Sequence, residues 1–178
     1  MAVNKDGHER EDGKEEEESF LAYSAEWLQG FGLRVPDESL LQAGVGFYDS
    51  LITQAISVDM EEPGRIVCSM RVPPSLCNAG DRLHGGAITS LVDIIGSAAI
   101  FSTGKTYSGV SVEINVTFMA AAPLGEEIEI ESKALRVGKS LAFVAVDIRL
   151  KATGKLVAQG RHTKFLGSSP PNVARSRL

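Results

Sequence analysis

The segment Gly85–Phe101, with the sequence GGAITSLVDIIGSAAIF, decides the fold of this chain. When it is wound as a helix, apolar side chains lie on nearly every side, which is the pattern of a buried helix and not of an amphipathic surface helix. The segment is shorter than the roughly 20 apolar residues that cross a membrane, and Asp93 interrupts it. We therefore expect no membrane span here, but one long helix in the core of a globular domain.

Six segments around this helix show the two-residue alternation of β-strands, two before the helix and four after it. Short turns, such as residues 138–139 and 152–155, join the later segments. An antiparallel sheet can bury the apolar helix by curling around it, which is an α+β arrangement. The expected strands are Ile52–Met60, Arg65–Val72, Gly109–Phe118, Glu126–Val137, Ser140–Lys151 and Leu156–Leu166.

Composition divides the 178 residues into four regions. Residues 1–18 carry eight acids and three bases, which accounts for the whole net charge of −5, and we expect a solvated, disordered tail there. We expect a helical segment in residues 19–50, the main domain in residues 51–167 and a flexible tail in residues 168–178. Because the rest of the chain is neutral, we expect neither nucleic-acid binding nor a basic membrane-binding face.

The cysteines and histidines argue against a metal site. Two cysteines, Cys68 and Cys77, are too few for a disulfide framework and favour a reducing compartment. The three histidines, His8, His84 and His162, have no metal-ligand spacing with the cysteines or with one another. We therefore expect neither a metal nor another cofactor.

Two features of the long helix indicate a site. Gly85 and Gly86 stand at its start, where backbone N–H groups without a helical partner carry the positive end of the helix dipole. Such donors suit an acceptor that gains negative charge during a reaction, for example a thioester carbonyl. The second feature is Asp93, because a carboxylate in an apolar helix is costly to bury unless it is paired. Asp93 follows Gly86 by about two turns, on roughly the same face.

Three segments closely resemble the PaaI-type hotdog thioesterases: Asn78–Gly86 with the helix that follows, Gly109–Asn115, and Gly154–Lys164. The resemblance spans about residues 51–167. It implies the hotdog fold, in which one sheet wraps one helix, and subunits that dimerise edge to edge and often double to a homotetramer. It also implies an acyl-CoA substrate and an active site at the dimer interface.

The resemblance assigns roles to individual residues. The family's asparagine falls on Asn78, and the glycine that polarises the thioester carbonyl falls on Gly85. The helix carboxylate falls on Asp93, and the serine that orients water falls on Ser111. His84 matches the histidine that precedes the glycine pair. These five residues are the expected catalytic group.

The family's coenzyme A contacts fall around Phe118–Pro123 and Arg136–Leu141. Together with the second glycine of the pair, these segments give the expected substrate-binding residues. They are Gly86, Phe118, Arg136, Gly138, Lys139 and Ser140.

The expected mechanism is hydrolysis of the thioester. The backbone of Gly85, with the side chain of Asn78, would bind the carbonyl oxygen, and Asp93 of the other subunit would act as general base on water, with a nucleophilic role as the alternative. Ser111 would position that water. Strict alternation places Ser111 on the opposite side from the apolar face of Val110–Phe118, which would leave it open to a site between subunits.

Two other functions remain as alternatives. A hotdog hydratase or dehydratase would use a histidine with an acid, here His84 with Asp93, but the match at Ser111 argues against it. A non-catalytic acyl-CoA-binding hotdog protein is the other. Binding alone would not require a costly buried carboxylate, so Asp93 together with Ser111 disfavours it.

The sequence ends in Ser176-Arg177-Leu178, which is similar to the peroxisomal address Ser-Lys-Leu and keeps its central positive charge. The acidic N-terminus has neither the apolar segment of a secretory signal nor the basic composition of a transit peptide. We therefore expect the peroxisome as the location, with the cytoplasm as the alternative.

Overall fold

The computed structural model describes residues 47–167. The features expected in residues 1–46 and 168–178 lie outside this range. The described residues form two α-helices, one 3₁₀ turn and six strands. In chain order these are α3 Phe47–Thr53, β1 Ile56–Glu62, β2 Arg65–Arg71, η1 Pro74–Leu76, α4 Gly85–Phe101, β3 Val110–Phe118, β4 Glu127–Val137, β5 Leu141–Leu150 and β6 Leu156–Phe165.

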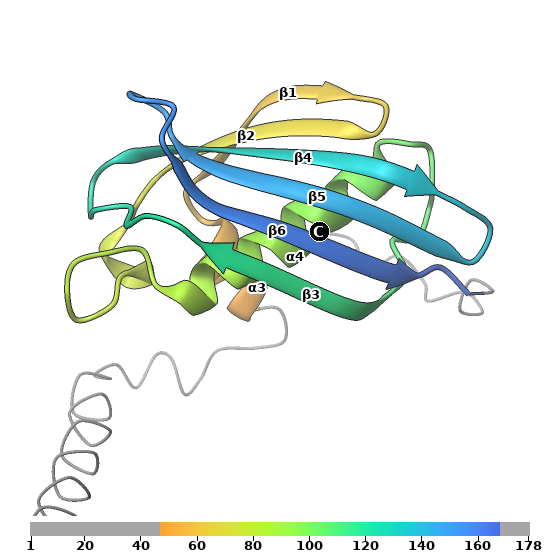
Figure 1. Cartoon of the computed structure of the whole chain (residues 1–178), viewed down its shortest axis with the longest axis horizontal. Coiled ribbons are helices and arrows are strands. Elements are labelled where there is room, and N and C mark those ends of the chain that lie inside the picture. The colour runs from red at the N-terminus through yellow and green to blue at the C-terminus, as the bar shows by residue number, and fades with distance from the viewer. Residues whose placement is uncertain (1–46, 168–178) are drawn as a thin grey trace, which may run out of the picture. The chain divides into compact units, whose positions relative to one another are not determined.

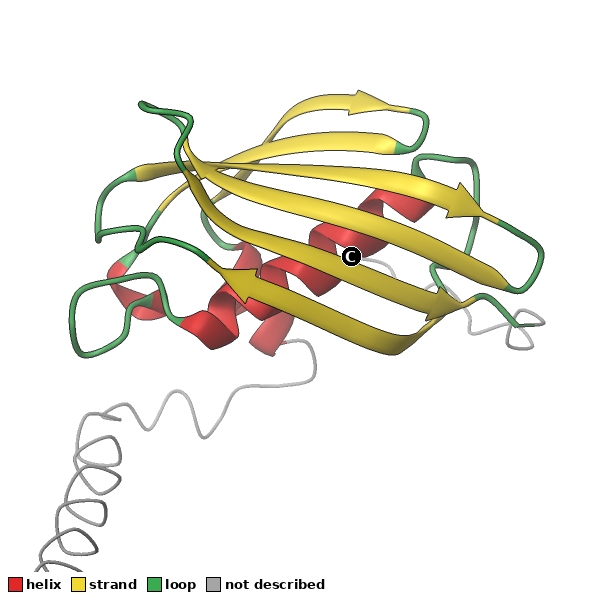
Figure 2. Cartoon of the chain, viewed as in Figure 1, coloured by secondary structure: helices red, strands yellow, loops and turns green. Residues whose placement is uncertain are grey.

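The six strands form one antiparallel sheet in the order β1-β2-β4-β5-β6-β3. Within the described residues, β1 and β3 are therefore its two edges. The long helix α4 lies along one face of the sheet (Figure 1), and the shorter helix α3 lies on the same side (Figure 2). The α+β fold expected from the sequence, one antiparallel sheet around one long helix, is confirmed.

The core lies between α4 and the inner face of the sheet. Alternate residues of β5, from Ala142 to Ile148, are buried, which is the pattern of a strand with one face on a core. Full burial of an aliphatic side chain stabilises a fold by about 1.5–3 kcal/mol, so the helix and the sheet hold each other in place. The buried residues of α4 are Ala87, Ile88, Leu91, Val92, Ile95, Gly96, Ala99 and Ile100.

Gly160 sets the distance between α4 and the sheet. It lies inside β6 and is buried, with Val92 of the helix directly above it. A Cβ atom added to Gly160 would lie 2.6 Å from Cγ1 of Val92, closer than side chains approach each other. Glycine inside a strand commonly marks such a close approach. The missing side chain therefore lets the helix pack against the backbone of β6.

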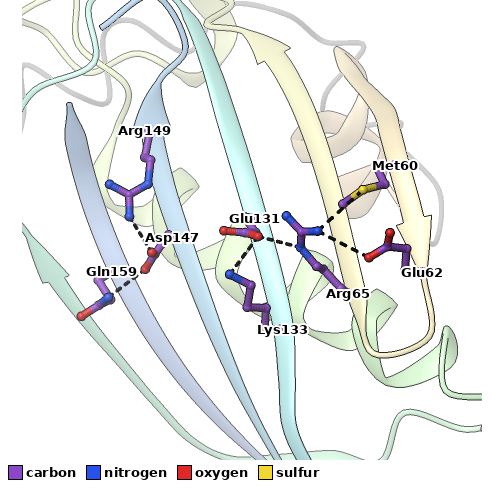
Figure 3. Close-up of polar contacts among 8 residues, drawn as sticks. All are labelled: Met60, Glu62, Arg65, Glu131, Lys133, Asp147, Arg149 and Gln159. Carbon is purple, nitrogen blue, oxygen red and sulfur yellow. Dashed lines mark hydrogen bonds and ion pairs between the residues drawn. The ribbon is translucent and has the colours of Figure 1, made fainter. Parts of the chain in front are cut away.

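The outer face of the sheet carries charges that are paired locally. Glu131 and Asp147 lie opposite each other on β4 and β5, a position in which like charges repel. Each carboxylate is held by its own donors at 2.7–2.9 Å, and Lys133 in particular lowers the pKa of Glu131. The donors are Arg65 and Lys133 for Glu131, and Arg149 and Gln159 for Asp147 (Figure 3).

The expected strand Ile52–Met60 is wrong at its beginning. Ile52 and Thr53 end the helix α3, and β1 begins only at Ile56. Ile52 is buried against the core, and Oη of Tyr48 lies 2.6 Å from Oγ of Ser90 on α4. A short apolar segment has no periodicity that separates a helical turn from a strand, so packing on α4 decides the outcome.

A β-bulge in β3 overturns the expected side of Ser111. Ser111 pairs with Lys164 of β6, whereas Glu113 already pairs with Thr163, so Val112 is one extra residue in β3. Opposed residues of a sheet share a face, and Lys164 is buried on the helix side. Ser111 therefore lies on the inner face, together with Ile114 and Val116, and not opposite to them.

We predict that Gly160→Ala destabilises the fold by about 1–3 kcal/mol, because the added methyl group overpacks the contact with Val92. The measurement is the free energy of unfolding in urea. Arg161→Ala is the matched control, since Arg161 is the exposed neighbour in the same strand and should change the free energy by less than about 0.5 kcal/mol. Equal effects of the two substitutions would contradict the close approach at Gly160.

Candidate active site

The two glycines at the start of α4 use their backbone N–H groups differently. His84 is the N-cap, in an extended conformation, and its Nδ1 accepts a hydrogen bond of 2.9 Å from the N–H of Gly86. Within residues 47–167, the N–H of Gly85 has no acceptor. The two glycines are therefore not equivalent: Gly86 is used in capping, and Gly85 can donate to a ligand at the positive end of the helix.

Asn78 is held by the loop that leads into α4. Its Oδ1 accepts from the N–H groups of Gly80 at 2.9 Å and Arg82 at 3.3 Å. These bonds stabilise a tight turn in which Asp81 has a φ of 54°, a conformation that aspartate tolerates better than most residues. Because the oxygen of the amide is engaged in the loop, its NH₂ group is the half that remains for a ligand.

Phe118 belongs to this end of the molecule. It is the last residue of β3, and its ring carbon Cε1 would lie 3.6 Å from a Cβ atom built on Gly85. The ring is 55% exposed, so it forms an open apolar wall beside the helix start. His84, Gly85, Gly86 and Phe118 therefore lie together, and Asn78 belongs to the loop that leads into the helix. We call these five residues the helix-start group.

A second polar cluster lies at the middle of α4. Oδ1 of Asp93 accepts a hydrogen bond of 3.2 Å from Oγ of Ser111, so the two expected residues meet within one chain. Nε2 of His162 lies 2.9 Å from the same Oγ and 3.5 Å from Oδ1. Nζ of Lys164 lies 3.6 Å from Oδ1 and donates to Oγ of Ser97 at 2.6 Å. We call these five residues the mid-helix group.

Asp93 is less buried than its apolar surroundings in the sequence indicate. Its side chain is 42% exposed, whereas those of His162 and Lys164 are 0% and 6% exposed. The expectation of a buried carboxylate is therefore wrong for the single chain, because one side of α4 faces away from the sheet. The three contacts reach Oδ1, and within residues 47–167 nothing donates to Oδ2.

The surroundings of His162 favour its neutral form. Burial lowers its pKa below the usual 6.5, the neighbouring Lys164 cation lowers it further, and Asp93 acts in the opposite direction. The contact of 3.5 Å between His162 and Asp93 therefore does not require a charged ring. The buried cation of Lys164 is the group that balances the charge of Asp93 from the sheet side.

The remaining expected binding residues lie around the hairpin between β4 and β5. Arg136, Lys139 and Ser140 are exposed. A bond of 2.8 Å from the N–H of Gly138 to the carbonyl oxygen of Leu141 closes the hairpin. A second bond of 2.8 Å, from the N–H of Leu166 to the carbonyl oxygen of Ser140, joins the hairpin to the end of β6. Strand register places this hairpin at the Ser111 end of the sheet, since Ala142, Lys164 and Ser111 are consecutive partners across three strands.

The expected site residues thus form two separate halves. Gly85 and Asp93 are eight residues apart on α4, a distance of about 12 Å. Phe118 and Ser111 stand at opposite ends of β3, about 23 Å apart along the strand. About 13 Å along the helix separates His84 from Asp93, so these two cannot exchange a proton within one chain. A single chain assembles the helix-start group and the mid-helix group, but it keeps these two groups apart.

His162 and Lys164 were not expected as site residues. The sequence does contain a signal for them, because Gly160, His162 and Lys164 occupy alternate positions on the helix-facing side of β6. Two polar side chains at core-facing positions are unusual unless they are hydrogen-bonded.

Among residues 47–167 there is no group of three or more acidic, histidine or cysteine side chains arranged to hold a metal. No helix in the same range is long and apolar enough to cross a membrane.

Comparison with known proteins places the chain in a family. The model of the Thioesterase superfamily matches residues 80–158. The chain is 50% identical to human acyl-coenzyme A thioesterase 13 over 106 residues, which cover 60% of this chain and 76% of the human protein. The chain belongs to the thioesterase superfamily.

Solved structures agree with this assignment. Zebrafish thioesterase superfamily member 2 superposes with a TM-score of 0.66 at 44% identity, covering 70% of this chain and 88% of the zebrafish chain. The PaaI protein of Escherichia coli, from the phenylacetic acid degradation operon, superposes with a TM-score of 0.59 at 21% identity, covering 67% and 90% of the two chains. The latter likeness shows a shared fold, which is the hotdog fold expected from the sequence.

The depressed pKa of His162 predicts that stability falls in mild acid. An unfolded histidine titrates near pH 6.5, so between that pH and the lower folded pKa the unfolded chain binds more protons. The free energy of unfolding should therefore decrease as the pH falls below about 7. His162→Gln removes this proton uptake, so the melting temperature of the variant should depend less on pH between pH 8 and 5. Parallel curves for the two proteins would contradict a buried neutral ring.

Proposed function

We propose that the chain hydrolyses acyl-CoA thioesters to a free acid and coenzyme A. Two groups on one helix carry the proposal. The N–H of Gly85 has no acceptor among residues 47–167, and Asp93 is a partly exposed carboxylate whose Oδ2 receives no donor from that part of the chain. These two groups match the needs of thioester hydrolysis, which are stabilisation of an oxyanion and activation of water. The acyl-CoA thioesterase named among the relatives supports this substrate class.

The complete site is proposed to form between two subunits. In the described part of the chain β3 is a sheet edge, with Val110 60% and Val112 63% exposed, and open apolar edges favour pairing with another strand. Two β3 strands paired antiparallel about a two-fold axis would bring the Ser111 end of one next to the Phe118 end of the other. The mid-helix group of one subunit would then face the helix-start group of its partner.

The proposed reaction begins with the thioester oxygen bound by the N–H of Gly85 and the side-chain NH₂ of Asn78. Water oriented by Ser111 attacks the carbonyl carbon while Oδ2 of Asp93 takes its proton. The tetrahedral oxyanion is stabilised at the helix start. It then collapses, the C–S bond breaks, and the thiolate of coenzyme A takes the proton back from Asp93. A nucleophilic Asp93 would instead form an anhydride, and the ordered Ser111 contact favours the water route.

Coenzyme A is proposed to lie along the Arg136–Leu141 hairpin and against Phe118. Arg136 and Lys139 are exposed cations near the Ser111 end of the sheet, and they would attract the phosphates of the nucleotide. Phe118 would pack against the apolar part of the substrate from the partner's side of the interface. Gly86 would allow close approach of the substrate to the helix start.

A homotetramer is proposed on the basis of the outer face of the sheet. Val110, Phe165 and Leu141 are consecutive partners across β3, β6 and β5, and Phe143 lies further along β5. Their side chains are between 37% and 60% exposed, which is unusual for one contiguous apolar row. Packing of two dimers through this face would cover the row.

Asp93→Asn should lower kcat by on the order of 10²–10⁴-fold, because the general base is lost. The measurement is thiol release from a panel of acyl-CoAs. Since the substitution also leaves the buried Lys164 without its charged partner, Asp93→Asn with Lys164→Met is the matched control, which restores charge balance but not the base. Recovery of activity in the double variant would show that Asp93 is structural. Ser111→Ala should have a smaller effect than Asp93→Asn.

Mixed subunits test the shared site directly. Gly85→Pro removes the N–H donor at the first helical position, where proline is favoured, and the extended His84 before it is compatible with proline. Gly85→Pro and Asp93→Asn should each be nearly inactive alone. After joint unfolding and refolding, roughly a quarter of wild-type activity should return, because half of the dimers are mixed and each has one intact site of two. A mixture that stays inactive would place both groups of a site in one chain.

A peroxisomal location and a role in fatty acid metabolism stay predictions from Ser176–Leu178, which lie outside the described residues. The test is a fluorescent protein fused before the N-terminus, imaged with and without these three residues. Import should require them, since the receptor reads a free C-terminal tripeptide. Diffuse fluorescence from the intact fusion protein would favour the cytoplasm instead.

A further inference from the structure

We propose that His162 and Lys164 of β6 are positioning residues that hold Oδ1 of Asp93 and the hydroxyl of Ser111 in one arrangement, so that Oδ2 alone faces the reacting water. The inference rests on the proposed roles of Asp93 and Ser111 in hydrolysis. It adds two residues that touch neither the substrate nor the water, and it assigns the direction of each hydrogen bond between them.

The direction of the bonds follows from the number of protons available. Ser111 has one hydroxyl proton, and the 3.2 Å contact to Oδ1 of Asp93 uses it, because an ionised carboxylate can only accept. Nε2 of His162, 2.9 Å from the same Oγ, must then donate. The neutral ring therefore carries its proton on Nε2. The order of donation runs from His162 through Ser111 to Asp93.

The other ring nitrogen agrees with this tautomer. Nδ1 of His162 is buried and has no hydrogen-bond partner in the described structure. It faces Gly96 of α4, where a Cβ atom would lie only 3.2 Å from it. An N–H group placed there would be a buried donor without an acceptor, whereas a lone pair costs less. Gly96 also explains how the ring can pack so closely on the helix.

Lys164 also holds this carboxylate oxygen, Oδ1 of Asp93. Its Nζ donates to Oγ of Ser97 at 2.6 Å, and Oγ of Ser97 donates to the backbone oxygen of Asp93 at 2.9 Å. The ammonium group is thereby fixed 3.6 Å from Oδ1, in a side chain that is 6% exposed. A buried cation at this distance stabilises the carboxylate and favours the rotamer in which Oδ1 points to the sheet.

This arrangement has a consequence for the reaction. Three groups, on Ser111, His162 and Lys164, converge on Oδ1, and the described residues leave Oδ2 without a donor. A general base must present one lone pair to water in a fixed direction, and small errors in position are costly. Positions 162 and 164 would therefore act on kcat and leave the affinity for the acyl-CoA almost unchanged.

The kinetic test uses a matched pair of substitutions. His162→Leu removes the donor and retains an apolar side chain, and kcat should fall roughly 10-fold while KM stays nearly constant. His162→Gln places an amide N–H near the position of Nε2 and should recover most of the lost kcat. In the Ser111→Ala background, His162→Leu should cost no more than about twofold, because its effect passes through Ser111. The proposal would be overturned if the kcat losses of Ser111→Ala and His162→Leu multiplied in the double variant. It would also be overturned if His162→Gln folded but recovered none of the lost kcat.

A spectroscopic test does not depend on activity, and its main observation is made on the wild-type protein. In the wild-type protein labelled with ¹⁵N at histidine, the His162 ring should show a protonated Nε2 and an unprotonated Nδ1, and the Nε2 signal should shift in Ser111→Ala. A proton on Nδ1 would overturn the proposal. If Asp93→Asn retained full activity while this tautomer was observed, the proposed role of Asp93 would fail and the geometry around Ser111 would stand.

Discussion

The contact between Val92 and the bare backbone of Gly160 is the constraint on which the rest of the molecule depends. It brings α4 close to β6, so side chains on either side of Gly160 can reach the helix. Asp93 follows Val92 directly, and His162 and Lys164 follow Gly160 on the same face of the strand. The packing of the core and the cluster around Asp93 are therefore two results of one close approach. A larger residue at position 160 would move both.

Much of the fold could be predicted because helices and strands each have their own spacing of apolar residues along the sequence. Gly85–Phe101 and the strands from Arg65 onward were expected within one or two residues of their bounds, since long segments with a clear apolar pattern are the most reliable signals. The prediction for residues 52–53 was wrong because so short a segment carries no period, and packing on α4 decided its structure. Strand order was open as well, because pairing of β3 with β6 is a long-range contact.

The site was predicted less completely, for physical reasons that differ between residues. Gly85 and Asp93 are visible in the sequence as exceptions within an apolar helix. The side on which Ser111 lies was wrong, because alternation fails at the bulge around Val112. His162 and Lys164 were missed because their polarity is significant only once Gly160 shows which face of β6 is buried. The sequence did not show that the helix-start group and the mid-helix group are separate, because this depends on the distance between the two ends of β3 in the folded chain.

The bulge in β3 means that the geometry of this strand carries information apart from its composition. If the bulge were straightened with Val112 kept in the strand, Val112 would pair with Lys164 and Ser111 with Phe165. Ile114 and Val116 could stay in the core, while Ser111 would turn to the outer face. A change that straightens the strand would therefore remove the serine from the site without touching its own codon. A chain changed in this way could keep the fold and its capacity for binding, and lose hydrolysis. Comparison of strand geometry, and not only of residues, would then separate enzymes from inactive members of the superfamily.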